Sequence, residues 1–380
     1  RAERRAVVRE AAAASAVLLT NRGRVLPLAP EGGPIALIGP FVDDTAQMIG
    51  PWSGLGDQDE IVTLRAGFAA AFPGREVRVA EGCAADHAED DAGAARDAVL
   101  IAEAEALARG CDVVVLALGE PSELSGEAAS RARPGLTGRQ AELATRILAL
   151  GKPCVVVMSC GRPLIETELL KKADATLVVW YPGSEGGRAV ADLVAGVVSP
   201  SGSLPVSWPL DVGQIPVFFG ERPSGRPFVL GEHFTTQYLD VPNTPLFPFG
   251  HGLSYDDFGL EAPRPSSPAF RAGEGVVVTT KVTNLGARAG ATTVFLFARD
   301  VVASTARPLL ELKRFETIEL AAGETRDLAF ALTAADFTLL GPDLEPRLEP
   351  GRFDLSVGFS ADRASLKTVA VELLAEPAVA

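Results

Sequence analysis

The sequence predicts an α/β domain with a mostly parallel sheet covered by helices, an α/β sandwich, followed by an all-β sandwich. Up to about residue 200, short apolar runs alternate with stretches of helical periodicity, which is typical of a parallel sheet covered on both faces. Beyond residue 262 the apolar residues recur at every second position, which indicates exposed-and-buried strands. At 380 residues the chain suits two or three domains.

The first half reads as alternating helices and strands. The strands are predicted at 35–39, 76–80, 112–118, 154–158 and 176–180, and helices at 1–20, 64–72, 94–109 and about 185–198. A further helix after the loop at 119–131 has the predicted buried stripe Leu143, Ile147 and Leu150. The run from Asp112 to Leu118 has no polar alternation, so we expect a strand buried on both faces. Thr137 and Gln140 have the spacing of a capping box for the helix that follows them.

The last part of the chain predicts short antiparallel strands. Alternation is clear in three segments, 276–282, 328–332 and 353–357, with turn signals at Gly323 and Gly351. Six or seven strands in about 115 residues indicate a sandwich of immunoglobulin or fibronectin type III kind. No cysteine lies in this region, so the fibronectin type III-like form is favoured.

These patterns predict four segments. Residues 1–30 are expected to form a linker helix from a domain outside this chain, 31–210 the α/β sandwich domain, 211–261 an irregular connector and 262–380 the fibronectin type III-like domain. The connector is rich in Pro, Gly, Ser and Asn, with embedded aromatic residues. The chain opens at Arg1 in what reads as helix within a domain, so we expect it to be a fragment of a longer precursor.

Composition narrows the partners. A formal net charge of −14 and a pI near 4.8 argue against nucleic acid and anionic membrane surfaces, since both need a basic face. No apolar run approaches the roughly 18 residues that span a bilayer. The 4 cysteines have no zinc-site spacing and are expected to be small buried hydrophobes. We therefore predict no metal and no organic cofactor.

The loop at 119–131 is the candidate site. Glu120, Glu123 and Glu127 lie just beyond the carboxyl end of the predicted strand 112–118, which is where α/β sheets bind ligands. The residues beside Glu127 are small and leave room for a large group to approach. Arg131 is expected either to pair with Glu127 or to brace the loop, and Glu120 to hydrogen-bond backbone within the loop.

The chain resembles the C-terminal portion of glycoside hydrolase family 3 β-glucosidases. The matching blocks, in chain order, are VLLTNRGRVLPL (17–28), IALIGP (35–40), IGPWSGLGD (49–57), GEPSELSGEAASR (119–131), GKPCVVVMSCGRPL (151–164), WYPGSEGG (180–187), SPSGSLPVSWP (199–209) and YLDVPNTPLFPFGHGLSY (238–255). Members of this layout have an N-terminal (β/α)8 barrel, then an α/β sandwich, then a fibronectin-like domain. This chain holds the counterparts of the last two.

The resemblance implies a retaining mechanism with two carboxylates. One is an Asp in a Ser-Asp-Trp motif on the barrel, and this motif is absent from the sequence. The other is the general acid/base, and the matching residue is Glu127, for which contact with an acidic barrel pocket is expected to raise the pKa. Trp52 matches a residue in the wall of the leaving-group sugar site, so Trp52, Arg131 and Glu123 are the predicted substrate-binding residues. Glu123 stays open as an alternative acid.

The predicted function is the acid/base half of a retaining, exo-acting β-glucosidase that releases terminal β-D-glucosyl residues and is active only with the barrel. The alternatives are a non-catalytic carbohydrate-binding or assembly module, a family 3 phosphorylase and a β-xylosidase. The expected partners are a β-linked oligosaccharide or β-glucoside and the barrel of the same precursor, with a homodimer possible through the fibronectin-like domain and connector. A periplasmic or secreted location is expected, with the cytoplasm as the alternative.

Overall fold

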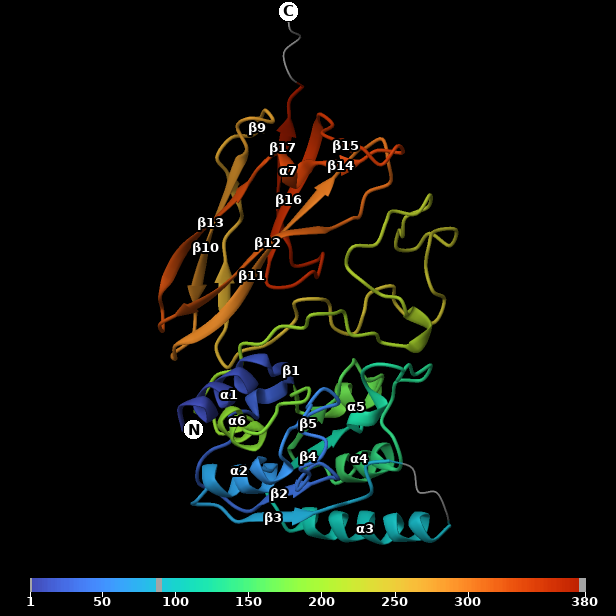
Figure 1. Cartoon of the computed structure of the whole chain (residues 1–380), viewed down its shortest axis with the longest axis vertical. Coiled ribbons are helices and arrows are strands. Elements are labelled where there is room, and N and C mark those ends of the chain that lie inside the picture. The colour runs from blue at the N-terminus through green and yellow to red at the C-terminus, as the bar shows by residue number, and fades with distance from the viewer. Residues whose placement is uncertain (1, 87–90, 376–380) are drawn as a thin grey trace, which may run out of the picture. The chain divides into compact units, whose positions relative to one another are not determined.

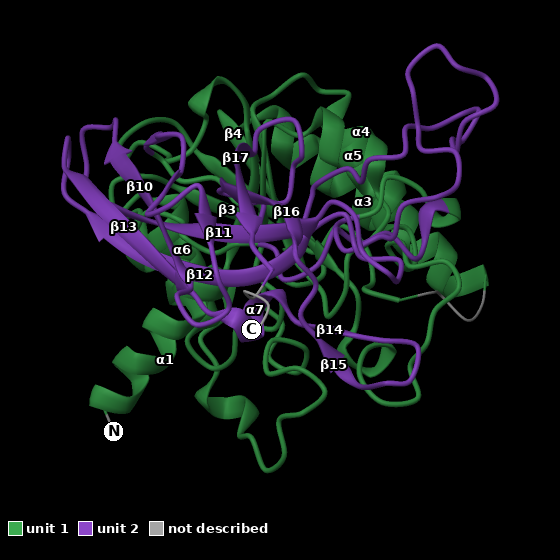
Figure 2. Ribbon diagram, turned by 90° about the horizontal axis from the view of Figure 1, so that it is seen from above, with its two compact units in different colours: residues 1–203, 209–213, 252–255 green, residues 204–208, 214–251, 256–380 purple. Residues whose placement is uncertain are grey.

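The computed structural model describes residues 2–86 and 91–375. The chain divides into two compact units, drawn in different colours in Figure 2. The first contains residues 1–203, 209–213 and 252–255, and the second contains residues 204–208, 214–251 and 256–380. The chain therefore passes between the units several times, so parts of the connector predicted at 211–261 belong to each.

The first unit is built on a six-stranded sheet with the order β1-β6-β5-β4-β2-β3. Its strands are β1 (Val17–Asn21), β2 (Ile35–Ile38), β3 (Val77–Ala80), β4 (Val113–Gly119), β5 (Cys154–Ser159) and β6 (Ala175–Val178). Every pairing is parallel except that of β1 with β6. All seven residues of β4 are buried, as expected for a central strand with both faces covered. The mostly parallel sheet is confirmed.

Helices cover both faces of this sheet (Figure 1). They are α1 (Ala2–Ser15), α2 (Leu64–Ala71), α3 (Asp91–Arg109), α4 (Gln140–Leu148), α5 (Thr167–Lys172) and α6 (Gly186–Val194). On one face, Leu37, Val115 and Val157 share an apolar core with residues of α1, α2 and α6. On the other face, α4 contacts α3 and α5. The side chains of Leu143 and Ile38 both lie close to Gly82, where a Cβ atom would collide with Leu143.

The N-terminal helix is shorter than predicted. We expect one helix over 1–20, but α1 ends at Ser15 and the next residues form β1 at the edge of the sheet. Val17, Leu18 and Leu19 are each at most 1% exposed. Three consecutive buried apolar residues fit a strand with both faces covered better than one face of an amphipathic helix. The predicted linker segment 1–30 thus contributes a strand to the sheet.

The capping-box prediction at the start of α4 is wrong. The residue that caps this helix is Arg139, without a side-chain cap. The Gln140 side chain instead donates to the Gly119 carbonyl at 2.9 Å, and its oxygen accepts the Gly119 N–H at 2.9 Å. The Thr137 hydroxyl donates to the Ala85 carbonyl at 2.5 Å. Both side chains therefore bond to residues distant in sequence, at the end of β4 and in the loop before α3, instead of capping the helix.

The second unit contains a β-sandwich. One sheet has the order β13-β10-β7, with β8 also on β10, and the other has the order β12-β11-β16-β17-β9. The strands are β7 (Phe258–Leu260), β8 (Arg264–Pro265), β9 (Ala269–Phe270), β10 (Val276–Asn284), β11 (Gly290–Asp300), β12 (Glu311–Leu320), β13 (Thr325–Leu332), β16 (Gly351–Gly358) and β17 (Lys367–Leu373). A helix, α7 (Ala334–Phe337), and a small hairpin of β14 (Leu339–Leu340) and β15 (Pro346–Arg347) complete the elements.

The alternation predicted for the second unit is present. In β10 buried residues take every second position, and Val278, Phe330 and Leu355 lie in one core cluster. A second apolar cluster forms around Phe295 and Phe297 of β11, where Phe219 and Phe249 of the connector pack. The segment predicted as connector contains the short turn η4 (Val212–Gln214) and, near its end, strand β7 of the sandwich, and it is held partly by aromatic packing within this unit.

Two further features concern binding classes. Over the described ranges 2–86 and 91–375, no helix combines the length and apolarity required to cross a bilayer. Among the same residues, no group of three or more His, Cys, Asp or Glu side chains is placed to hold a metal ion. The cysteines Cys83, Cys111, Cys154 and Cys160 are all buried and unbridged, as predicted.

Candidate active site

The candidate site lies at a reversal of strand order in the sheet. From β2 the chain passes through α2 to β3 on one side, and from β4 it passes through α4 to β5 on the other. β2 and β4 are neighbours and parallel, so the loops that follow them leave the same sheet edge in opposite directions. Ligands of α/β proteins bind in the crevice that such a divergence creates.

These two loops meet. A Cβ atom added to Gly126 would lie 3.4 Å from the Trp52 indole nitrogen and 3.4 Å from Pro51. The Ser122 N–H donates to the Gln47 side-chain oxygen at 2.6 Å, which ties the loop after β4 to the loop after β2. The Trp52 side chain is 73% exposed. A large aromatic face is therefore presented next to the loop that carries Glu127.

Glu127 is exposed at the tip of this loop, between two residues with left-handed backbone. Gly126 has φ 95° and Ala128 has φ 59°. A positive φ is strained by about 1–2 kcal/mol for a residue with a Cβ such as Ala128. Strain of this kind persists where the surrounding structure imposes the conformation, and it is frequent at functional sites. Glu127 is thus exposed and flanked by backbone that the surrounding structure holds in a strained conformation.

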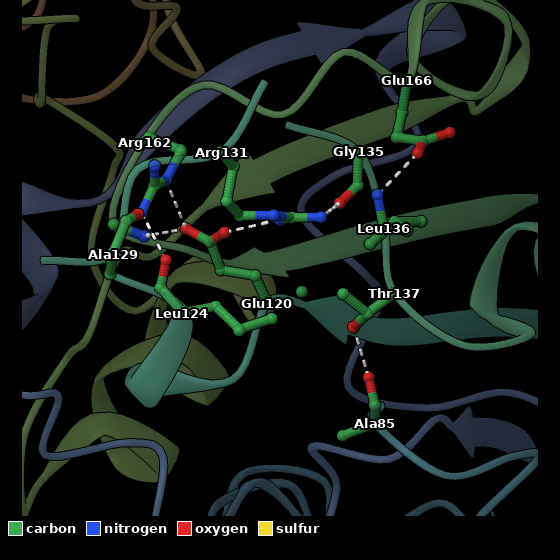
Figure 3. Close-up of polar contacts among 12 residues, drawn as sticks. Ala85, Glu120, Leu124, Ala129, Arg131, Gly135, Leu136, Thr137, Arg162 and Glu166 are labelled. Atoms are coloured by element: carbon green, nitrogen blue, oxygen red, sulfur yellow. Dashed lines mark hydrogen bonds and ion pairs between the residues drawn. The ribbon is translucent and has the colours of Figure 1, made fainter. Parts of the chain in front are cut away.

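Glu120, at the end of β4, is fully buried and carries two ion pairs (Figure 3). Arg131 lies 2.7 Å from one carboxylate oxygen, and Arg162 lies 3.1 Å from the other. The Gly161 N–H also donates to this carboxylate. We expect Glu120 to bond backbone within its own loop, and this is wrong: its partners are two guanidinium groups and the backbone of the loop after β5. A buried carboxylate requires such compensation of its charge.

The two arginines hold the loop on either side of Glu127. The Arg162 guanidinium donates to the Leu124 carbonyl and, at 2.8 Å, to the Ala129 carbonyl. Arg131 donates to the Gly135 carbonyl at 2.9 Å. Arg131 thus pairs with Glu120 and bonds within the loop, and its predicted contact with substrate stays a prediction.

Glu123 lies nearby in a short 3-10 turn, η3 (Ser122–Leu124), and its side chain is exposed. Asp44 supports the opposite loop, because its carboxylate accepts the backbone N–H groups of Ala46, Gln47 and Met48. Burial raises the pKa of Asp44 despite these bonds. Since Glu123 belongs to the loop after β4, it lies at the same carboxyl edge of the sheet as Glu127 and Trp52. Its role as a substrate contact stays a prediction.

Arg162 and Gln47 are the residues that the sequence analysis does not single out. Both follow a strand at the same carboxyl edge: Gln47 after β2 and Arg162 after β5. Because β5 lies beside β4, a basic residue directly after β5 is within reach of the Glu127 loop. The strand-end rule that selects Glu127 also applies to Arg162, which stands in the block GKPCVVVMSCGRPL.

Two domain families match this chain. Residues 16–255 match the glycosyl hydrolase family 3 C-terminal domain, and residues 292–361 match the fibronectin type III-like domain. The fold and these matches define a part of a glycoside hydrolase. The chain belongs to glycoside hydrolase family 3, as the sequence motifs indicate, and it carries the C-terminal domain of that family.

Similar proteins agree with this assignment. The chain is 37% identical to a periplasmic β-glucosidase of Salmonella typhimurium, covering 96% of this chain and 49% of that protein. It is 35% identical to a β-xylosidase of Formosa agariphila, covering 97% and 50%. A crystal structure of a Listeria innocua β-glucosidase with isofagomine superposes with a TM-score of 0.89 at 37% identity, covering 96% and 49%. The chain thus spans about half the length of these relatives.

Proposed function

We propose that this chain supplies the general acid/base, Glu127, of a retaining exo-β-glucosidase whose nucleophile is an Asp in the N-terminal half found in its relatives. The observation that carries the proposal is the place of Glu127. It is exposed at the strand-order reversal, beside the free indole face of Trp52. The similar proteins support β-glucoside chemistry, since several are β-glucosidases and one was solved in complex with glucose.

The proposed reaction has two displacements. In the first, the Glu127 carboxylic acid gives its proton to the glycosidic oxygen while the Asp carboxylate forms a bond to the anomeric carbon, and the alcohol leaves. In the second, the Glu127 carboxylate takes a proton from water, the water oxygen bonds to the anomeric carbon, and the bond to the Asp breaks. Retention requires the two carboxyl groups to lie roughly 5–5.5 Å apart across the sugar.

Glu127 suits this role physically. Its side chain reaches solvent from a backbone fixed by left-handed residues, so it is free to meet a group supplied by other polypeptide. Trp52 suits the leaving-group sugar, because an indole face packs on the apolar C–H face of a pyranose. The deciding experiment is Glu127→Gln in the full-length protein. For a β-glucoside with a poor leaving group we expect kcat/KM to fall by about 10²–10⁴-fold, the size of general-acid catalysis.

Two further readouts make this test specific. An aryl β-glucoside with a very good leaving group needs no proton, so its kcat/KM is expected to fall far less, and azide is expected to restore turnover with formation of β-glucosyl azide. Glu168→Gln is the matched control, since Glu168 is an exposed helical glutamate whose side chain is 74% accessible. A wild-type rate for Glu127→Gln on both substrates would refute the proposal. A large loss in Glu123→Gln instead would transfer the acid role to Glu123.

A β-xylosidase is the second candidate, and the similarity to a β-xylosidase of Formosa agariphila favours keeping it. The nitrophenyl β-glucoside and β-xyloside, compared by kcat/KM with the full-length protein, separate the two. Product analysis with and without inorganic phosphate tests the phosphorylase alternative. Inactivity of the full-length protein on all of these substrates, together with saturable binding of a β-linked oligosaccharide, would favour the binding module.

The proposal has three further parts: activity requires the N-terminal half, the protein lies outside the cytoplasm, and it forms a homodimer. Residues 1–380 alone are expected to lack enzyme-like turnover, because the nucleophile motif is absent from them. We propose a periplasmic or secreted protein, since a relative is named a periplasmic β-glucosidase, and fractionation of the native cells tests this. Size-exclusion chromatography with light scattering tests the predicted homodimer.

A further inference from the structure

The loop that carries Glu127 has little regular structure of its own. Between β4 and α4 it contains one short 3-10 turn, and the backbone beside Glu127 is left-handed at Gly126 and Ala128. A general acid has to be held within about 0.5 Å of its productive position. A loop with strained backbone and an exposed tip needs support from outside to meet this requirement.

Arg162 provides such support from a different strand end. One of its terminal nitrogens donates to the carbonyls of both Leu124 and Ala129, so this single group closes the loop around residues 125–128. Its Nε atom lies 3.1 Å from Glu120, which orients the guanidinium plane. Figure 3 shows the guanidinium between the Glu120 carboxylate and these two carbonyls.

Glu120 in turn is fixed by the sheet. Its backbone N–H donates to the Ser159 carbonyl of β5 at 3.0 Å, and its side chain is 0% exposed. Arg131 occupies the second carboxylate oxygen, so the carboxylate cannot turn away from Arg162. The loops after β4 and β5 also touch directly, since a Cβ on Gly161 would stand 1.9 Å from the Ser125 hydroxyl oxygen.

We propose that Arg162 is a positioning residue: its guanidinium, oriented by buried Glu120, clamps the carbonyls of Leu124 and Ala129 and thereby fixes Glu127 for proton transfer. The proposal rests on the proposed function of Glu127. If Arg162 served only to neutralise Glu120, its contact with the Glu120 carboxylate would suffice. Here one terminal nitrogen of Arg162 donates to the two carbonyls that bracket the exposed glutamate, while its Nε bonds to Glu120. The planar guanidinium holds these two nitrogens at a fixed distance and angle, which a single ammonium nitrogen cannot do.

The test is Arg162→Lys in the full-length protein. Lysine keeps a positive charge but has one nitrogen on a flexible stem, so it cannot hold Glu120 and the two carbonyls through two rigidly spaced donors. For a β-glucoside with a poor leaving group we expect kcat/KM to fall by about 10- to 100-fold, as for a catalytic group displaced by about 1 Å. For a dinitrophenyl β-glucoside, whose departure needs no proton, we expect a loss of less than about 3-fold, since little of the acid's effect is then at stake.

A double-mutant cycle separates positioning from general support. If Arg162 acts through Glu127, adding Arg162→Lys to Glu127→Gln is expected to change kcat/KM by less than about 2-fold, because residues that act as a unit are not additive. Titration of the sites with a 2-fluoro-glucoside that carries the same dinitrophenyl leaving group counts the folded molecules, so partial unfolding does not imitate the result.

The matched control is Arg75→Lys. Arg75 also donates to two loop carbonyls, those of Gly33 at 2.8 Å and Ala29 at 3.2 Å, but it does so before β2 and β3, at the amino edge of the sheet. It is expected to retain wild-type kcat/KM on both substrates.

The outcomes are distinguishable. Equal losses on both substrates, or the full Arg162→Lys loss on top of Glu127→Gln, would overturn the clamp while leaving Glu127 as the acid. An active Glu127→Gln variant would overturn the proposed function and the clamp together.

Discussion

The carboxyl edge of the α/β sheet and the interior of the β-sandwich differ in where their charged groups lie. At the sheet edge a fully buried carboxylate, Glu120, is surrounded by two arginines that hold a loop. In the sandwich the core cluster is apolar, and an ion pair such as Lys281 with Asp327 stands at the surface. Buried charge is weak evidence for stability, because its desolvation offsets its attraction. The difference indicates that the ion pairs at the sheet edge fix the position of a loop, whereas the apolar core of the sandwich provides stability.

Removing the buried carboxylate should give the largest effect. In Glu120→Ala, Arg131 and Arg162 lose their shared partner, and breaking a buried pair costs about 3–5 kcal/mol. We expect faster amide exchange in the loop 121–136 and in β4 of the full-length protein, with exchange in the sandwich strands unchanged. Activity on poor leaving groups should fall with it. Wild-type exchange in this loop would show that Glu120 does not hold it.

A core truncation in the sandwich should be nearly as costly but different in kind. Leu355 is 0% exposed within the sandwich core, so Leu355→Ala is expected to destabilise this unit by about 3 kcal/mol through the cavity it leaves. Amide exchange in β10 and β16 should accelerate, while kcat/KM per folded site stays at the wild-type value. A selective loss on poor leaving groups would contradict the division between geometry and stability.

Alkaline pH should weaken the α/β unit more than the sandwich, since all four cysteines lie in the former. Burial raises the pKa of Cys83 to about 12 and that of Cys154 to about 12, from an ordinary thiol pKa of 9.0. The unfolded chain therefore loses these protons first, and stability present below about pH 9 is lost as the pH rises toward 12. At pH 10 the free energy of unfolding is expected to be about 1–2 kcal/mol lower for each of Cys83 and Cys154 than at neutral pH.

Unfolding followed at pH 8 and pH 10 checks this, with exchange in β5 as the local readout. Cys154→Ala should reduce the dependence on pH, after allowance for the small cavity it creates. A pH dependence that is the same in both units, or unaffected by removing a thiol, would be inconsistent with burial of the neutral form as its cause.

The smallest effect is expected at the sandwich surface. Asp327→Asn removes the pair with Lys281, whose charged atoms are 3.9 Å apart and whose side chains are 48% and 79% exposed. Exposed pairs of this kind contribute less than about 1 kcal/mol. The unfolding midpoint of the variant should stay close to that of the wild type, and raising the salt concentration should narrow the remaining difference. A shift as large as that of Leu355→Ala would mean that surface charge, too, holds the sandwich together.

The sequence by itself determined the alternation of most strands and helices and the location of the candidate loop, but it did not predict β1 or the short helix α5. Continuous apolar runs identify the central strands, and period-two alternation at Val278, Phe330 and Leu355 identifies the sandwich, because burial on one face or two leaves a direct trace in residue type. The strand-end rule selects the loop that carries Glu127, and the family motifs point to the same loop.

Tertiary structure decided the partners of polar groups, because these bonds join residues far apart in the chain. Gln140 bonds to the end of β4 instead of capping its helix, and Glu120 pairs with Arg162, which lies 42 positions away. Nothing in local spacing selects between such partners. Whether Val17 to Asn21 continue a helix or form a strand depends likewise on the presence of β6, since an edge strand exists only where a neighbour supplies its hydrogen bonds.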